Sequence, residues 1–205
     1  MNFQSQIEKF SKERLKNVET RITTVEGKKL VECTKDGEKI TVDTGLSSLG
    51  FCEDTNPDTK IYKVLDKLYI SSQDGACSKN ELTALKITHI LNVATGVANA
   101  FLDDFTYKNV EILDLPETRI QPYFKEMFDF IEKGFHHGSV LVHCNAGVSR
   151  STTVIVAFLM HKLHMSLNDA LQMVKDSKPS VKPNDGFIRQ LKEYEQQLGL
   201  YKDYS

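Results

Sequence analysis

The stretch His143-Cys144-Asn145-Ala146-Gly147-Val148-Ser149-Arg150-Ser151 lies between two apolar segments and decides the fold. Just before it, the short run Ser139-Val140-Leu141-Val142 is apolar and β-rich, which is typical of a fully buried strand. Just after it, residues 152–160 are apolar or weakly polar, and the run continues without a turn residue. That length is too great for a typical strand and ordinary for a buried helix. The sequence therefore predicts a central strand that ends at Cys144 and a helix that begins at Arg150.

A strand, a short loop and a helix in this order form an anion site. The first N–H groups of a helix have no acceptor within the helix, and the helix dipole adds partial positive charge there. The loop amides can point inward as a nest for phosphate oxygens, and Gly147 permits a backbone conformation that other residues resist. The same field favours the thiolate form of Cys144, and the planar guanidinium of Arg150 binds two oxygens at once. A nucleophile inside an oxyanion cradle predicts phosphoryl transfer through a cysteinyl-phosphate. The predicted phosphate-binding residues are Asn145, Ala146, Gly147, Val148, Ser149 and Arg150.

The nine residues quoted above resemble the His-Cys-x-x-Gly-x-x-Arg-Ser signature of the cysteine-dependent protein tyrosine phosphatases. Residues 113–116 upstream and 182–191 downstream resemble the dual-specificity subgroup of that superfamily. The resemblance extends over roughly residues 61–198. Three further stretches resemble the atypical dual-specificity phosphatases, and among them those that regulate stress-activated protein kinase pathways: residues 88–94, 99–102 and 114–118.

A phosphatase of this kind needs a proton donor for the departing oxygen, because a thiolate has no proton to give. Asp114 follows an apolar run, precedes the turn Leu115-Pro116 and matches the general acid of the family, with Glu117 as the fallback in the same loop. The alternative for Asp114 is a simple turn former. In the second half of the reaction the same carboxylate would activate water.

The resemblance also implies roles for a fourth catalytic residue, Ser151, and for two supporting residues, His143 and Asn184. Ser151 is expected to direct its hydroxyl at Cys144 and stabilise the departing thiolate, the alternative being an ordinary serine in the first turn of a helix. His143 precedes the nucleophile on a strand, so its side chain points to the opposite face and is expected to brace the loop. Asn184 is expected to tie the loop to the last helix, and a pure N-cap role is equally open.

The rest of the chain predicts an α/β fold with a mostly parallel central sheet flanked by helices on both faces. Ligands bind such sheets beyond the carboxyl ends of the strands, where Cys144 and Asp114 both fall. The expected strands are residues 68–72, 89–94, 110–113 and 139–142. The expected helices lie in 78–85, 122–138, 150–164, the segment after Ser166, and the segment from Asn184 to Gly199.

Residues 1–57 are expected to form an N-terminal extension, and residues 58–205 the dual-specificity phosphatase catalytic domain. Phe3, Ile7 and Phe10 have helical spacing, which favours a helix that either packs on the catalytic domain or docks a kinase partner. Residues 20–44 contain three short alternating segments separated by Gly-containing turns, which predict a small β-meander. A linker rich in turn residues follows from 45 to 58.

Composition limits the compartment and the partners. The chain has 205 residues and a net charge of −2, which argues against a nucleic-acid-binding protein. No apolar run approaches the length of a membrane span, and the first residues carry neither a signal core nor a myristoylation glycine. A cytoplasmic protein is expected, with entry into the nucleus by diffusion. The four cysteines show no C-x-x-C spacing, so neither a metal site nor a disulfide framework is expected. No cofactor is expected, because Arg150 and the loop amides carry the charge.

The resemblance implies hydrolysis of phosphotyrosine and phosphoserine or phosphothreonine on proteins, in a MAP kinase or stress kinase pathway. Three other classes remain alternatives. A rhodanese-like sulfur transferase would not need Arg150 and Ser151 after the cysteine. A phosphoinositide phosphatase would carry basic residues inside the loop, whereas the loop here is uncharged before Arg150. A catalytically weak phosphoprotein-binding scaffold of the same fold usually lacks the cysteine, the arginine or the acid, and all three are present.

Overall fold

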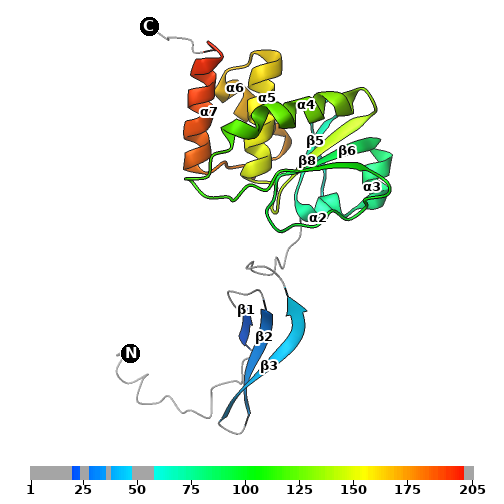
Figure 1. Ribbon diagram of the computed structural model, residues 1–205, viewed down its shortest axis with the longest axis vertical. Helices are drawn as coiled ribbons and strands as arrows, with labels where there is room; N and C mark the ends of the chain where they lie inside the picture. Colours follow the sequence, from blue (N-terminus) through cyan, green and yellow to red (C-terminus); the bar gives the residue numbers. More distant parts are fainter. Residues whose placement is uncertain (1–19, 24–27, 36–37, 48–57, 201–205) are drawn as a thin grey trace, which may run out of the picture. The chain divides into compact units, whose positions relative to one another are not determined.

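The computed structural model describes residues 20–23, 28–35, 38–47 and 58–200 of the chain (Figure 1). The chain forms two compact units, divided between residues 55 and 56. The helix predicted within residues 1–18 lies outside the described residues.

The N-terminal unit contains an antiparallel sheet of three strands in the order β1-β2-β3: β1 Thr20–Thr23, β2 Lys28–Lys35 and β3 Glu38–Ser47. This sheet confirms the predicted meander, but the third strand is longer than expected. The sequence assigned Gly45-Leu46-Ser47 to the linker, whereas Ser47 pairs with Lys28 across a register irregularity. A glycine inside a strand is compatible with pairing where the ladder is irregular, so turn-forming composition alone placed the boundary too early.

The second unit is built on a sheet of five strands in the order β4-β5-β8-β6-β7. Strand β4 pairs antiparallel with β5, and the other three pairings are parallel, which confirms the mostly parallel sheet. Strand β8 lies in the middle, so the loop that follows it emerges from the centre of the sheet edge. The strands are β4 Tyr62–Leu65, β5 Leu68–Ser71, β6 Ile87–Asn92, β7 Thr106–Asn109 and β8 Ser139–His143.

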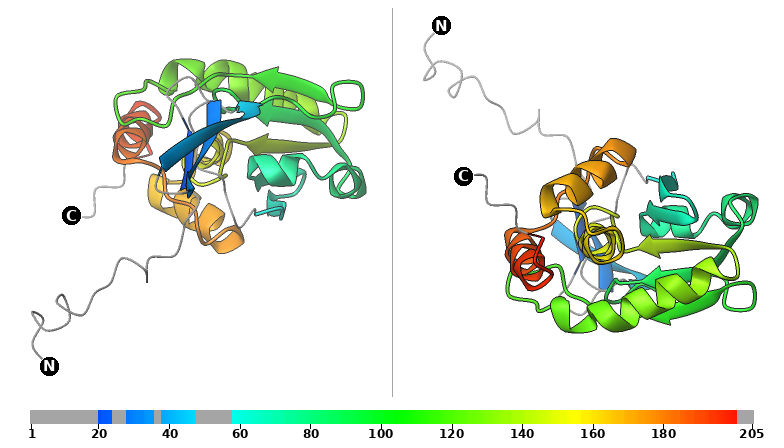
Figure 2. Two further views of the ribbon diagram at one scale, coloured as in Figure 1. Left: turned by 90° about the horizontal axis from the view of Figure 1, so that it is seen from below. Right: turned by 90° about the horizontal axis from the view of Figure 1, so that it is seen from above.

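Helices cover both faces of this sheet, as predicted (Figures 1 and 2). Side chains alternate along β8: Val140 and Val142 join the cluster formed with the long helices, and Leu141 joins the smaller cluster on the other face. One face carries α2 Gln73–Ala76 and α3 Lys79–Ala84. The other carries the 3₁₀ turn η2 Gln121–Tyr123, α4 Phe124–Phe135, α5 Arg150–Leu163, α6 Leu167–Ser177 and α7 Asp185–Gln197.

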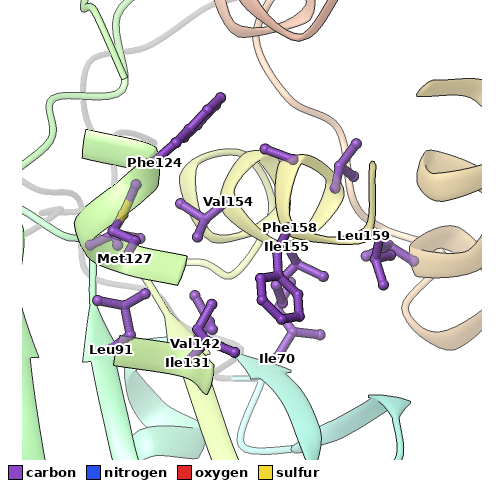
Figure 3. Close-up of a cluster of buried hydrophobic side chains, with 14 of the residues drawn as sticks. Ile70, Leu91, Phe124, Met127, Ile131, Val142, Val154, Ile155, Phe158 and Leu159 are labelled. Atoms are coloured by element: carbon purple, nitrogen blue, oxygen red, sulfur yellow. The ribbon is translucent and has the colours of Figure 1, made fainter. Parts of the chain in front are cut away.

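Helix α5 lies at the centre of the larger cluster. Val154, Ile155 and Phe158 pack over the strands, with α4 beside them (Figure 3). Every residue of α5 from Arg150 to Met160 is buried. A helix that is apolar all round needs such an environment, which overrides the strand preference of its β-branched residues. Because α5 is buried on all sides, the first turn of the helix is held in place. Arg150 and Ser151 lie in that turn and are therefore held in place as well.

One predicted strand is wrong, and two strands were not predicted. The missed strands are β4 and β7, and the strand expected at residues 110–113 is wrong, because the edge strand β7 ends at Asn109. Val110 N still donates to Asn92 O at 2.9 Å, but the chain then leaves the sheet edge. The carbonyl of Ile112 accepts a hydrogen bond from Arg150 at 3.0 Å instead of one from a strand. Val110 and Ile112 are buried in a connecting segment that leads to Asp114, whereas Leu113 is exposed.

No helix in the described parts of the chain is long and apolar enough to cross a membrane.

Candidate active site

The backbone of the loop between β8 and α5 is oriented as an anion cradle. Two of its carbonyls are bonded to other segments: Asn145 O accepts from Gln73 N at 2.8 Å, and Val148 O accepts from Lys182 N at 2.8 Å. Ser149 O accepts from Thr153 N at 2.9 Å. Among the described residues, none accepts a hydrogen bond from the N–H groups of residues 145–149. The loop thus has carbonyl groups bonded to neighbouring segments and N–H groups without acceptors in the part of the chain that the structure describes. This arrangement is typical of a phosphate-binding nest at a helix N-terminus.

Gly147 fixes the shape of this loop. Its φ is +68°, in the left-handed region that favours glycine. A Cβ at this position would lie 2.5 Å from the carbonyl oxygen of Ser71 and 2.9 Å from Ser72 N. Any side chain would therefore push the loop away from the end of β5.

Cys144 lies at the floor of the cradle with only 1% of its surface exposed. Its Sγ is 3.3 Å from the Oγ of Ser151, in the first turn of α5. The structure thus brings together the predicted nucleophile and the hydroxyl expected to support it. A hydroxyl at this distance can donate to a thiolate and stabilise its charge.

Arg150 is held in the wall of the cradle by two hydrogen bonds. Its Nη1 donates to Ile112 O at 3.0 Å and its Nη2 donates to the Asn145 Oδ1 at 2.6 Å. The buried Nε has no hydrogen-bond partner among the described residues. The nearest acid oxygen, Oδ2 of Asp114, is 3.6 Å away, which is close for an ion pair and long for a hydrogen bond. A buried guanidinium N–H without a partner indicates a place for an incoming anion.

Asp114 projects from the segment after β7 to the same cradle. Its Oδ1 accepts from the Ser149 hydroxyl at 2.7 Å and from the Asn184 Nδ2 at 2.8 Å. Among the described residues, Oδ2 accepts no hydrogen bond, and the side chain is 34% exposed. One oxygen is therefore anchored and the other faces the site beside Arg150. Glu117, the alternative acid, is exposed and makes none of these contacts.

Asn184 carries out both of the roles that the sequence left open. Its Oδ1 accepts from Phe187 N at 2.9 Å and caps α7, while its Nδ2 donates to Asp114. Its own backbone N–H donates to the Ser149 Oγ at 3.1 Å, which ties α7 to the phosphate loop. Ser149 occupies the N-cap position of α5 without making a cap bond; its hydroxyl donates to Asp114, and its oxygen accepts from Asn184 N. Sequence reasoning placed Ser149 in the loop but missed this link to the acid.

His143 lies behind the loop and is 2% exposed. Its Nδ1 is 3.3 Å from the carbonyl oxygen of Cys144, so the side chain braces the loop, away from the anion. Burial lowers the pKa of His143 from 6.5 to about 4, although the Cys144 carbonyl opposes this shift. The imidazole is therefore neutral at physiological pH.

The lowered pKa of His143 predicts acid sensitivity. Between pH 6.5 and about 4 the unfolded chain binds a proton at this histidine and the folded chain does not, so folding stability falls as pH decreases. We expect the difference in unfolding free energy between wild type and His143→Gln to shrink by about 2–3 kcal/mol from pH 7 to pH 4.5. Denaturant titrations of both proteins at several pH values measure it. A difference that stays constant with pH would contradict the burial of a neutral imidazole.

No group of three or more His, Cys, Asp or Glu side chains that could hold a metal ion occurs within the described residues.

Residues 68–197 match the family of dual specificity phosphatase catalytic domains. This chain belongs to the dual-specificity phosphatase family. It is 45% identical over 193 residues to the mouse dual specificity protein phosphatase 19, an alignment that covers 92% of this chain and 88% of the relative. Curated dual-specificity phosphatases at this level of identity identify the chain as a dual-specificity protein phosphatase, a phosphoric monoester hydrolase.

Solved phosphatase structures share the fold of the second unit. A mouse putative dual specificity phosphatase complexed with zinc tungstate is 32% identical, with a TM-score of 0.65, over 74% of this chain and 94% of that one. The human tyrosine phosphatase-like serine/threonine/tyrosine-interacting protein is 30% identical, with a TM-score of 0.64, over 67% of this chain and 96% of that one. The protein tyrosine phosphatase-like fold predicted from the sequence is therefore confirmed for this phosphatase.

Proposed function

We propose that this phosphatase hydrolyses phosphotyrosine and phosphoserine or phosphothreonine on proteins through a phosphate ester of Cys144. The observation that carries the proposal is that the buried Nε of Arg150 has no hydrogen-bond partner among the residues that the structure describes, in the same loop and helix start that hold the unused loop amides and the buried thiol of Cys144. A phosphate dianion would satisfy all these donors at once, because its oxygens accept several hydrogen bonds in a compact shell. The related mouse protein was crystallised as a complex with zinc tungstate, and because tungstate is an oxyanion, this supports oxyanion binding by a relative of the same fold.

In the first step, the Sγ of Cys144 attacks phosphorus and forms the S–P bond. The P–O ester bond breaks, its electron pair goes to the departing oxygen, and Asp114 gives that oxygen a proton from Oδ2. Oδ2 suits this task because it is the oxygen that makes no hydrogen bond among the described residues. The negative charge that develops on phosphorus-bound oxygens is stabilised by Arg150 and the loop amides, which are already oriented.

In the second step, water attacks phosphorus and gives a proton to the carboxylate of Asp114. The S–P bond breaks, its electron pair returns to sulfur, and inorganic phosphate leaves. The hydroxyl of Ser151, 3.3 Å from Sγ, donates to the returning thiolate and makes it a better leaving group. Asp114 ends the cycle protonated, so the same carboxyl group serves as acid and base in turn.

Phosphorylated proteins are the proposed partners, and kinases of a MAP kinase or stress kinase pathway are the proposed substrates. The support is the resemblance of residues 88–94, 99–102 and 114–118 to the stress-activated protein kinase pathway-regulating phosphatase. The cytoplasm, and the nucleus by diffusion, are the proposed compartments.

The geometric basis that we propose for dual specificity is a shallow site in a short catalytic unit. A phosphotyrosine ring places phosphorus far from the peptide backbone, whereas phosphothreonine keeps it close. A tyrosine-restricted phosphatase therefore needs a deep pocket with a Tyr-bearing recognition loop, and no Asn-Arg-Tyr element occurs in this sequence. A shallow site admits both esters.

Steady-state kinetics on matched peptides test dual specificity. We expect turnover of singly phosphorylated phosphotyrosine and phosphothreonine peptides that share the sequence of a kinase activation loop. Phosphotyrosine should be faster, because phenolate is the better leaving group. Turnover of phosphotyrosine alone would leave a tyrosine-only enzyme.

The alternative is a catalytically weak scaffold that binds phosphoproteins. The related human protein is named as an interacting protein and as phosphatase-like, so this fold also occurs under such a description. The same kinetics separate the two functions: phosphopeptide binding without turnover in the wild type would favour the scaffold. The presence of Cys144, Arg150 and Asp114 in one cradle favours the enzyme.

A further inference from the structure

Helix α7 contacts the segment that bears the acid along one of its faces. We call residues 114–121 the acid segment. The side-chain oxygen of Gln190 accepts from Ile120 N at 2.9 Å and from Gln121 N at 3.3 Å. Its amide nitrogen donates to Thr118 O at 2.8 Å. One half-buried amide thus satisfies donors and an acceptor of the acid segment's backbone at the same time.

Gly186, one turn before Gln190 on the same face, lets the acid segment lie directly on the helix. A Cβ on Gly186 would be 1.8 Å from the carbonyl oxygen of Pro116 and 2.4 Å from its carbonyl carbon. Both contacted atoms are backbone, so no rotamer change could make room. The absence of a side chain at Gly186 therefore sets how close the acid segment comes to α7.

The helix that makes these contacts is itself firmly placed. Asn184 caps its first turn, and Phe187 and Leu191 are fully buried on the core side. The acid segment is anchored in the core at Ile120, but its first four residues have little burial of their own. Residues 114–117 are exposed, and their turn is closed by a backbone hydrogen bond from Thr118 N to Leu115 O at 3.0 Å. The Ser149 hydroxyl and Asn184 anchor one oxygen of Asp114, and the backbone that carries this residue is placed by its contacts with α7.

We infer that Gln190 and Gly186 are positioning residues for catalysis: they fix the acid segment so that the free Oδ2 of Asp114 meets the departing oxygen. Both act through the acid segment and neither contacts the phosphate in the proposed mechanism. The inference rests on the proposed role of Asp114 as the acid. It adds which residues hold the carboxyl group in line with the departing oxygen. Misplacement by about 1 Å is enough to cost on the order of 10²-fold in rate.

Gln190→Met tests the inference, because methionine keeps the length of the side chain and removes both polar atoms. We expect kcat/KM, which reports the ester-cleavage step alone, to fall about 10- to 100-fold for phosphotyrosine and alkyl phosphates, whose leaving groups need a proton. The loss should be less than about threefold for an aryl phosphate with a strongly acidic phenol. KM should change little, since the phosphate cradle is untouched. A measured melting temperature shows that the variant is folded at the assay temperature.

A double-mutant comparison makes the test specific. If Gln190 acts through the acid, Gln190→Met should cost almost nothing further in an Asp114→Asn background. The matched control is Gln197→Ala, since Gln197 is also on α7 and accepts from the side chain of Gln121 at 2.6 Å, but at an exposed position. The control should keep wild-type rates on every substrate.

Gly186→Ala tests the same contact between α7 and the acid segment by a different change, the addition of a Cβ to the helix. Because the new Cβ displaces the backbone of Pro116, we expect the same dependence on leaving group, with a loss at least as large as that of Gln190→Met. This variant keeps the amide of Gln190, so agreement between the two variants assigns the effect to the position of the acid segment.

Three results for Gln190→Met would overturn the inference. The rate could fall equally for all leaving groups, or it could stay unchanged for esters with poor leaving groups. The variant could also cause its full loss of rate again in the Asp114→Asn background. The proposed function is judged separately, from Asp114→Asn alone. If that single variant shows no dependence on the leaving group, the acid assignment fails, whatever Gln190→Met does.

Discussion

Cys144→Ser is expected to lower kcat by about 10⁴-fold or more, with phosphopeptide binding retained. A serine hydroxyl does not ionise in this cradle, so no nucleophile remains to form the ester with phosphorus. The cradle itself should persist, because two of its carbonyls are held by Gln73 and Lys182 and not by the thiol. Turnover of a phosphotyrosyl peptide and its binding by titration calorimetry measure the two effects separately.

Cys77→Ser is the matched control for this substitution. Cys77 is an exposed cysteine at the end of α2, and the same exchange of sulfur for oxygen there should leave kcat unchanged. Activity of Cys144→Ser within tenfold of the wild type would exclude a covalent mechanism through this residue.

Asp114→Asn is expected to lower kcat by about 10²- to 10⁴-fold on phosphopeptides. Asparagine can still accept the hydrogen bonds from Ser149 and Asn184 at its oxygen, so the acid segment should keep its place. What is lost is the proton that Oδ2 gives in the first step and the base that accepts a proton from water in the second. The loss in kcat/KM, which reports the first step alone, should therefore shrink on aryl phosphates whose phenols are acidic enough to leave without protonation, and a series of such esters measures it.

Glu117→Gln is the control for the acid, since Glu117 is an exposed carboxylate in the same segment. It should behave as the wild type on every ester. A loss for Asp114→Asn that is equal on good and poor leaving groups would assign Asp114 a structural role, and a large loss for Glu117→Gln would move the acid to that residue.

The phosphate cradle could be predicted from the sequence because it is local. A short apolar run, an uncharged loop with one glycine, and a long apolar run specify strand, turn and buried helix within about 20 residues. The helix N-caps at Ser166 and Asn184 could also be predicted from the sequence. In the structure the Ser166 side chain accepts from Asp169 N and the Asn184 side chain accepts from Phe187 N. Local patterns were sufficient wherever one segment determines its own conformation.

The segment before Asp114 shows where local patterns fail. Residues 110–113 have the apolar character of a strand, but a strand also needs a partner. Here the carbonyl of Ile112 is bonded to Arg150, a residue far along the chain. Burial against α5 and pairing in a sheet select the same residue types, so composition could not separate them.

Residues that act between distant segments could not be found from the sequence either. Gln190 looks like any polar residue on an amphipathic helix, and Lys178 looks like an exposed residue before a proline. In the structure Lys178 is 1% exposed, where it pairs with Asp58 and lies over the ring of Tyr62. Long polar side chains become buried only when tertiary contacts supply their partners, and no local signal marks those partners.

The most direct test of the covalent mechanism is a rapid-quench experiment on the wild-type protein. The enzyme is mixed with an excess of phosphotyrosyl peptide, stopped with acid within the first turnover, digested and analysed by mass spectrometry, with Cys144→Ser treated in parallel. The mechanism predicts one phosphoryl group on the peptide that contains Cys144, and none in the variant. Turnover in the wild type with no phosphate on Cys144, or with phosphate on another residue, would contradict it.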